Sequence, residues 1–152
     1  MDAAPLTTLN LRLADAYRVE QHGLAVLERI AGNDELPDEV RTRAALHQVE
    51  TRAQRAVIFR ALSSLSPMLL ERLEQAETDV TPSSPGIGQW IQLEKREIGA
   101  FGDLLPYARL VELDGLDKAC AAALDLQRSV LHWLHSLHDT ESCFPAGLLP
   151  AT

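Results

Sequence analysis

The sequence predicts an all-α protein, and three observations support this prediction. Four long segments repeat apolar residues at the three- and four-residue spacing of an amphipathic helix, and none alternates convincingly as a strand does. Their interiors are rich in strong helix formers, and the stretches between them contain the Gly, Pro and Asn residues that end helices. With 152 residues, 46% of them hydrophobic, the chain is long enough to bury the core of one globular domain.

The first two predicted helices form a hairpin. The first covers residues 6–30 and is stopped by Gly32 and Asn33, since both residue types are common just after a helix. The second covers residues 37–65 and begins with Pro-Asp-Glu, which suits the first turn of a helix. The short turn between them predicts antiparallel packing.

The remaining elements follow from similar signals. A shorter amphipathic segment is predicted at 67–77, followed by a loop rich in proline, glycine and serine at 81–88. The third long helix is predicted over residues 89–113, and Pro106 inside it is expected to bend it or break it locally. After a short turn, the fourth helix is predicted over 116–138, antiparallel to the third.

The connection between the two hairpins predicts the topology. The stretch between residues 65 and 89 contains its own short helix and is long enough to run the length of a bundle. Hairpin, long crossover and hairpin is the ferritin-like connectivity. We therefore predict one ferritin-like four-helix bundle domain over residues 1–138. Residues 139–152, with two prolines and a glycine, are predicted to be a C-terminal tail that packs on the surface or frays.

The composition disfavours several classes of function. Lys and Arg total 14 against 22 Asp and Glu, which gives a net charge of −8. An acidic chain is poorly suited to nucleic acids or anionic membranes, because both bind basic patches. We see no signal peptide and no apolar run as long as a membrane span. Of the two cysteines, Cys120 lies on a predicted core face, so we expect a reduced, cytoplasmic protein.

Each long helix carries a polar residue in the middle of its apolar stripe: Glu20, Glu50, Glu97 and Gln127. At a rise of about 1.5 Å per residue from the two hairpin turns, these residues have similar depths, so we expect them in one layer of the bundle. A buried ionised carboxylate is costly unless it is paired, hydrogen-bonded or bound to a metal. The predicted layer therefore needs a chemical explanation.

The first explanation is a metal site. His47 lies three residues before Glu50, the spacing of the Glu-x-x-His pair of di-iron bundles in reverse order. Carboxylate oxygens and imidazole nitrogens bind iron, manganese and zinc. We predict one or two ions of iron or another divalent metal, with the ligands Glu20, His47, Glu50 and Glu97. The polar side chains predicted to support these ligands are Tyr17, Gln54, Glu94, which lies at the flank of its stripe, and Gln127.

The second explanation is a hydrogen-bonded polar layer that has lost its metal. Gln127 favours it, because the fourth helix offers a neutral amide where a di-iron bundle has a carboxylate. In that layer some carboxylates are protonated, since burial raises their pKa. The chain would then be a non-enzymatic structural or interaction bundle. The retained His47 and Glu50 pair opposes this interpretation, and both explanations stay open at this point.

An unidentified protein partner is a third option. The amphipathic segment 67–77 and the tail residues 144–149 carry apolar stripes that the groove of a partner accepts. Such stripes more often cover the protein's own core.

Four stretches resemble the YciE/YciF-type ferritin-like family: DAYRVEQ at 15–21, HQVET at 47–51, LEKREIGAFGDLL at 93–105 and, more loosely, ALDLQRSVLHWL at 123–134. With the long crossover, the resemblance covers nearly all of residues 6–138. It implies a four-helix bundle with two shorter elements, a homodimer, and an association with bacterial stress responses. If two metals bind, we expect oxidation of Fe(II) by O₂ or peroxide.

Overall fold

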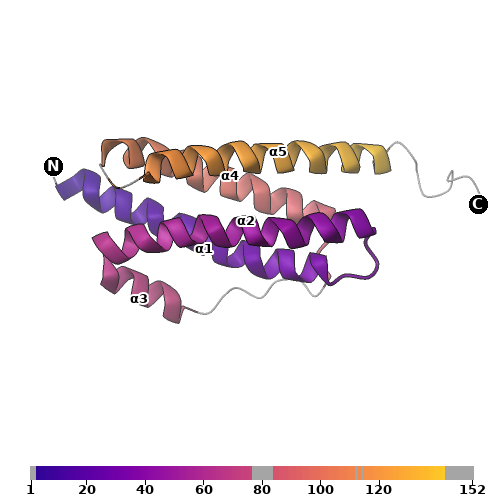
Figure 1. Ribbon diagram of the computed structural model, residues 1–152, viewed down its shortest axis with the longest axis horizontal. Helices are drawn as coiled ribbons and strands as arrows, with labels where there is room; N and C mark the ends of the chain where they lie inside the picture. The colour runs from indigo at the N-terminus through magenta and orange to yellow at the C-terminus, as the bar shows by residue number, and fades with distance from the viewer. Residues whose placement is uncertain (1–2, 77–83, 112, 114, 143–152) are drawn as a thin grey trace, which may run out of the picture.

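The computed structural model describes residues 3–76, 84–111, 113 and 115–142, and this part of the chain is built from helices and their connections. Four long helices lie side by side along the long axis of the molecule (Figure 1). They are α1 (Ala3–Ala31), α2 (Asp38–Leu65), α4 (Ile87–Leu110) and α5 (Leu116–Ser142). The short α3 (Pro67–Gln75) packs against α1 and α2 at one end of the molecule. The predicted all-α class and the helical bundle are confirmed.

The helices are arranged as two antiparallel hairpins, α1 with α2 and α4 with α5 (Figure 1). Contacts of α1 with α4 and of α2 with α5 join the hairpins, and the seam between α2 and α5 is the least closely packed of the four. α2 ends at the end of the bundle where α3 lies, whereas α4 begins at the opposite end (Figure 1). The chain therefore travels the length of the bundle between the hairpins.

Three predicted boundaries in the second hairpin are wrong, the first because α4 begins at Ile87, inside the predicted loop. α4 runs without interruption through Pro106 and ends at Leu110, so the local break is absent and the helix stops short of residue 113. The carbonyl that a proline deprives of its hydrogen bond belongs here to Gly102, which is exposed to water and can be satisfied there. α5 continues to Ser142, past the predicted end at 138, because no proline or glycine interrupts it there. Residues 143–152, including most of the predicted tail, lie outside the described residues.

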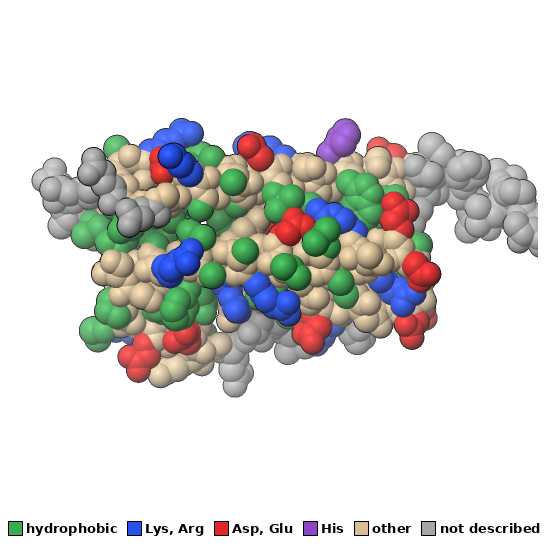
Figure 2. Space-filling model, viewed as in Figure 1, with side chains coloured by type: hydrophobic (Ala, Val, Ile, Leu, Met, Phe, Trp, Pro, Cys, Tyr) green, Lys and Arg blue, Asp and Glu red, His purple; other side chains and the backbone are tan. Residues whose placement is uncertain are grey.

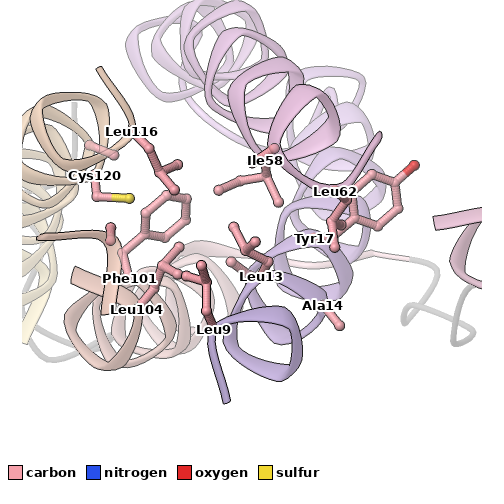
Figure 3. Close-up of a cluster of buried hydrophobic side chains, with 14 of the residues drawn as sticks. Leu9, Leu13, Ala14, Tyr17, Ile58, Leu62, Phe101, Leu104, Leu116 and Cys120 are labelled. Atoms are coloured by element: carbon pink, nitrogen blue, oxygen red, sulfur yellow. The ribbon is translucent and has the colours of Figure 1, made fainter. Parts of the chain in front are cut away.

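The apolar core consists of two clusters separated by a polar layer. The first cluster includes Leu13, Ile58, Phe101 and Leu116 and is shown in Figure 3. The second lies toward the other end of the bundle and is made from Leu27, Val40, Trp90, Leu134 and their neighbours. Along every long helix the two clusters are interrupted by at least one fully buried polar residue. The polar residues therefore occupy a shared depth, as the periodicity of the sequence indicates.

The short helix α3 and the residue Cys120 both contribute to the first apolar cluster. The side chains of Leu70 and Leu73 in α3 are buried in the first cluster, so this amphipathic segment covers the protein's own core. Cys120 also packs in that cluster and is 1% exposed, as expected of a small apolar residue. Among the described helices, none combines the length and the apolar character needed to cross a bilayer.

Candidate metal centre

The polar layer between the two apolar clusters is fully enclosed. Its side chains come from all four long helices, and each of them has an exposed fraction of 0%. They are Glu20, His47, Thr51, Glu94, Glu97 and Gln127. Three carboxyl groups and one imidazole in a dry layer form an unusual concentration of titratable groups, because residues of these types are rarely buried without a partner.

Three of these residues form a compact group. His47 on α2 and Glu94 and Glu97 on α4 each offer a ligand-type atom, and these atoms lie within 4.8 Å of one another. The Nε2 atom of His47 is 2.6 Å from Oε1 of Glu94 and 4.0 Å from Oε2 of Glu97. The two glutamates converge because residues three apart on a helix share one face. We refer to these three residues as the His47–Glu94–Glu97 cluster.

Trp90, which the sequence analysis did not single out, fixes one side of this cluster. Its indole N–H donates a hydrogen bond to Oε1 of Glu94 at 3.0 Å, from one turn earlier on α4. Its ring centroid lies 6.2 Å from that of His47 and 5.6 Å from that of Trp133, which meets it edge-on. The sequence could have predicted this contact, because residues four apart, such as Trp90 and Glu94, are neighbours on a helix.

Gly23 on α1 makes room for Glu97. A Cβ atom at this position would lie 2.7 Å from Oε1 of Glu97 and 3.2 Å from a methyl group of Leu93. The first distance is shorter than two such atoms tolerate, so any larger residue displaces the carboxyl group. The glycine therefore allows α1 to approach the cluster closely, three residues after Glu20 on the same helix.

Burial and mutual repulsion raise the pKa of two of the carboxyl groups, those of Glu20 and Glu97. Burial raises the pKa of Glu97 well above its usual range, and the neighbouring Glu20 and Glu94 raise it further, partly through a hydrogen bond with Glu94. Burial also raises the pKa of Glu20, with a further increase from Glu94 and an opposing effect of Arg55. Apart from such shared protons, no described residue donates a hydrogen bond to either oxygen of Glu20 or Glu97. The carboxyl oxygens are therefore available to a cation that displaces the protons.

Glu50, predicted as a ligand, lies at the edge of the layer. It is 18% exposed, and its Oε1 accepts a hydrogen bond from Arg43 at 2.7 Å. Its other oxygen lies 3.5 Å from Nδ1 of His47. The helical wheel placed Glu50 inward, but an arginine two turns earlier on the same face holds it toward the open seam between α2 and α5. Its contact to the second ring nitrogen suits a residue that orients the imidazole.

The other predicted supporting residues are divided between two places. Gln127 is fully buried in the layer, and its amide nitrogen donates a long hydrogen bond of 3.5 Å to Gln54. The ring of Tyr17 is buried, but its hydroxyl points away from the core (Figure 3), toward the side of the bundle where Arg55 and Glu74 lie. Glu94, placed at the flank of its stripe by the sequence, belongs to the cluster itself.

A groove of about 360 Å³ follows the seam between α2 and α5. Small and apolar side chains line most of it, including Ala53, Ala122 and Leu126. Glu50 and Gln54 line it too, and these residues contact His47 and Gln127, respectively. The groove therefore brings solvent closest to the polar layer on this side of the bundle.

Comparison with known proteins supports the fold. No family model matches the chain, and no curated protein matches it. Among solved structures, the protein XCC3681 from Xanthomonas campestris superposes with a TM-score of 0.72, covering 91% of this chain and 94% of that chain. The two sequences are 22% identical, so the similarity establishes a common helical fold and nothing about activity.

Proposed function

We propose that this protein is a ferritin-like bundle that binds one divalent transition-metal ion through the His47–Glu94–Glu97 cluster, with Glu20 as an additional ligand. The observation that carries the proposal is the gathering of three ligand-type atoms within 4.8 Å at a place where every contributing side chain is fully buried. Without a cation, such a site stores unfavourable energy in desolvated, mutually repelling carboxyl groups. A bound cation of charge two relieves this repulsion.

The donor set suits iron, manganese or zinc. One imidazole nitrogen and several carboxylate oxygens are the ligands that these ions share in helical bundles. The Nε2 atom of His47 faces Glu94, and Nδ1 faces Glu50, which can hold the proton on the far side of the ring. Metal binding then requires the carboxyl groups with a raised pKa, those of Glu20 and Glu97, to lose their protons. Iron in this place would supply redox chemistry toward O₂ or peroxide.

Occupancy by one ion is favoured over two. A second ion needs further anionic ligands, but Glu50 is engaged by Arg43 and Gln127 is neutral. Among the described residues, the single imidazole of the layer, that of His47, is already used by the first ion.

We propose that the chain belongs to the YciE/YciF-type family, and the matching sequence stretches and the two hairpins joined across the length of the bundle support this proposal. Through that resemblance we also propose a role in a bacterial stress response and a homodimeric state. Leu46 and Val49, exposed by 54% and 59% on α2, are suitable residues for a contact between two subunits. Light scattering on purified protein tests the dimer directly.

Metal titration tests the proposed site. We expect the chelator-treated protein to bind close to one Mn(II) or anaerobic Fe(II) ion per chain, with release of protons. Replacing Glu97 by Gln should abolish binding, whereas replacing the exposed Glu28 should leave it intact. Elemental analysis that finds less than about 0.1 ion per chain after loading would rule out metal binding as the function, because a built site fills under these conditions.

A metal-free structural or interaction bundle is the second candidate. The neutral Gln127 and the ion pair between Arg43 and Glu50 favour it, because both remove potential ligands. The variant Gln127→Glu separates the candidates. If the site is functional, the wild type binds metal without this change. If it is a relic, metal binding appears only in the variant or in neither protein.

A further inference from the structure

A second polar site lies on the other side of α2, where α1, α2 and α3 meet. An open pocket of about 560 Å³ is present there. Three of its lining residues are arginines of α2, namely Arg52, Arg55 and Arg60. Among the described residues, Glu74 of α3 is the single acid in the lining, so these residues give the lining a net charge of +2 in a chain of net charge −8. Figure 2 shows Lys and Arg side chains along the edge of α2.

The charge of the arginines in this pocket is only partly balanced by carboxyl groups, because Glu74 lies in the lining and Arg55 acts electrostatically on the buried Glu20. Arg55 donates a hydrogen bond to the neutral side chain of Gln21 on α1, which holds its guanidinium group in place. Among the described residues, no ion pair involves Arg52, Arg55 or Arg60. By contrast, Arg41 and Arg43 on the same helix are paired with acids. Positive charge is therefore concentrated at the pocket, where an anion can reach it.

The remaining lining residues add selectivity. The hydroxyl of Tyr17 points toward this side of the bundle (Figure 3) and offers a hydrogen-bond donor beside the guanidinium groups. Phe59, one turn beyond Arg55 on α2, is an aromatic residue with 39% of its surface exposed. Ala56 lies between these residues in the lining. A ligand that fits this surface has an anionic head and an apolar, flat portion.

We propose that this pocket binds the phosphate group of a small organic phosphate, with the organic portion over Phe59. Planar guanidinium groups bind phosphate oxygens in pairs, and a phosphomonoester carries close to two negative charges at neutral pH, which matches the lining. A carboxylate carries a single charge and leaves the lining only half neutralised. The volume lies in the range of pockets for small molecules, which is about 300–1,000 Å³.

Calorimetric titration of the full chain with phenyl phosphate tests the proposal. Inorganic phosphate lacks the ring and benzoate lacks the second charge, so these compounds are the matched comparisons. We expect saturable binding of phenyl phosphate, with both comparison compounds bound at least about tenfold more weakly. Equal binding of inorganic phosphate would overturn the role of Phe59, and equal binding of benzoate would overturn the preference for phosphate.

Two variants locate the site. We expect Arg55→Gln and Arg60→Gln each to weaken phenyl phosphate binding about tenfold or more, since each removes charge-assisted hydrogen bonds. Arg60 is exposed, so its replacement leaves folding intact even if that of Arg55 does not. Arg128→Gln, at an exposed position on α5, is the control for general charge attraction and should bind as the wild type does. An absence of saturable binding, or equal losses in all three variants, would overturn the proposal. The titrations are run with a chelator present, so their outcome is independent of the metal site.

Discussion

Replacing Glu97 by Gln should stabilise the metal-free protein at neutral pH while destroying its metal site. The folded-state pKa of Glu97 lies well above its ordinary value of 4.5, chiefly because of burial. Between these two pKa values the unfolded chain has lost the proton and the folded chain retains it. The stabilisation associated with the neutral carboxyl group is therefore complete below the unfolded pKa and is lost as the pH rises through the folded pKa.

The magnitude follows from this difference of one bound proton. In that window the free energy of unfolding falls by about 1.4 kcal/mol for each pH unit, for every carboxyl group that stays protonated in the folded state. Glutamine has nearly the same shape and does not titrate, so the Glu97 contribution to the slope disappears. The fall in stability between pH 5 and pH 7 should be shallower in the variant, and the variant should be the more stable protein at the upper end.

Urea denaturation in the presence of a chelator, repeated at several pH values, measures this effect. Glu28→Gln, at an exposed position of α1, is the matched control and should follow the wild-type curve. Adding excess Mn(II) should reverse the order of stability, because a ligand that binds only the folded wild type stabilises it. Parallel curves for the wild type and Glu97→Gln in the absence of metal would refute the assignment of a protonated, desolvated carboxyl group at this position.

The packing of the bundle leads to three further predictions. Gly23→Ala should displace the carboxyl group of Glu97 and weaken metal binding about tenfold or more, as seen by calorimetry, with little change in helix content. Burial raises the pKa of the Cys120 thiol to about 12, so it should react with a thiol reagent only as fast as the protein unfolds. Ala122→Trp should fill the groove between α2 and α5 and slow metal uptake in stopped-flow experiments. The exposed Ser129→Trp on the same helix should not slow it, and equal rates in both variants would remove the groove as an entry route.

The periodicity of the sequence was sufficient to predict the long helices and the depth of the polar layer in the bundle. The distances of Glu20, Glu97 and Gln127 from their hairpin turns, at a constant rise per residue, fix their height, and their place in an apolar stripe fixes their burial. The height and the burial can therefore both be predicted without knowing which helix packs against which. These three residues are accordingly all fully buried between the two apolar clusters.

Helical periodicity could not predict which residues form the His47–Glu94–Glu97 cluster. α4 packs against both α1 and α5, so its buried arc is wide enough to include Glu94 as well as Glu97. Glu50 has an inward direction on the helical wheel, but its charge is satisfied by Arg43 at the less closely packed seam. A helical wheel gives the direction in which a side chain leaves the helix, but it does not identify the ion-pair partner. The partner determines where the charged end of a long side chain lies.

Crystals loaded with Mn(II) provide the most direct test of the proposed metal centre. We predict an anomalous-scattering peak between α2 and α4, about 2.0–2.3 Å from Nε2 of His47 and from oxygens of Glu94 and Glu97. A peak only among acidic residues on the surface, or no peak in crystals whose protein takes up metal in solution, would contradict it.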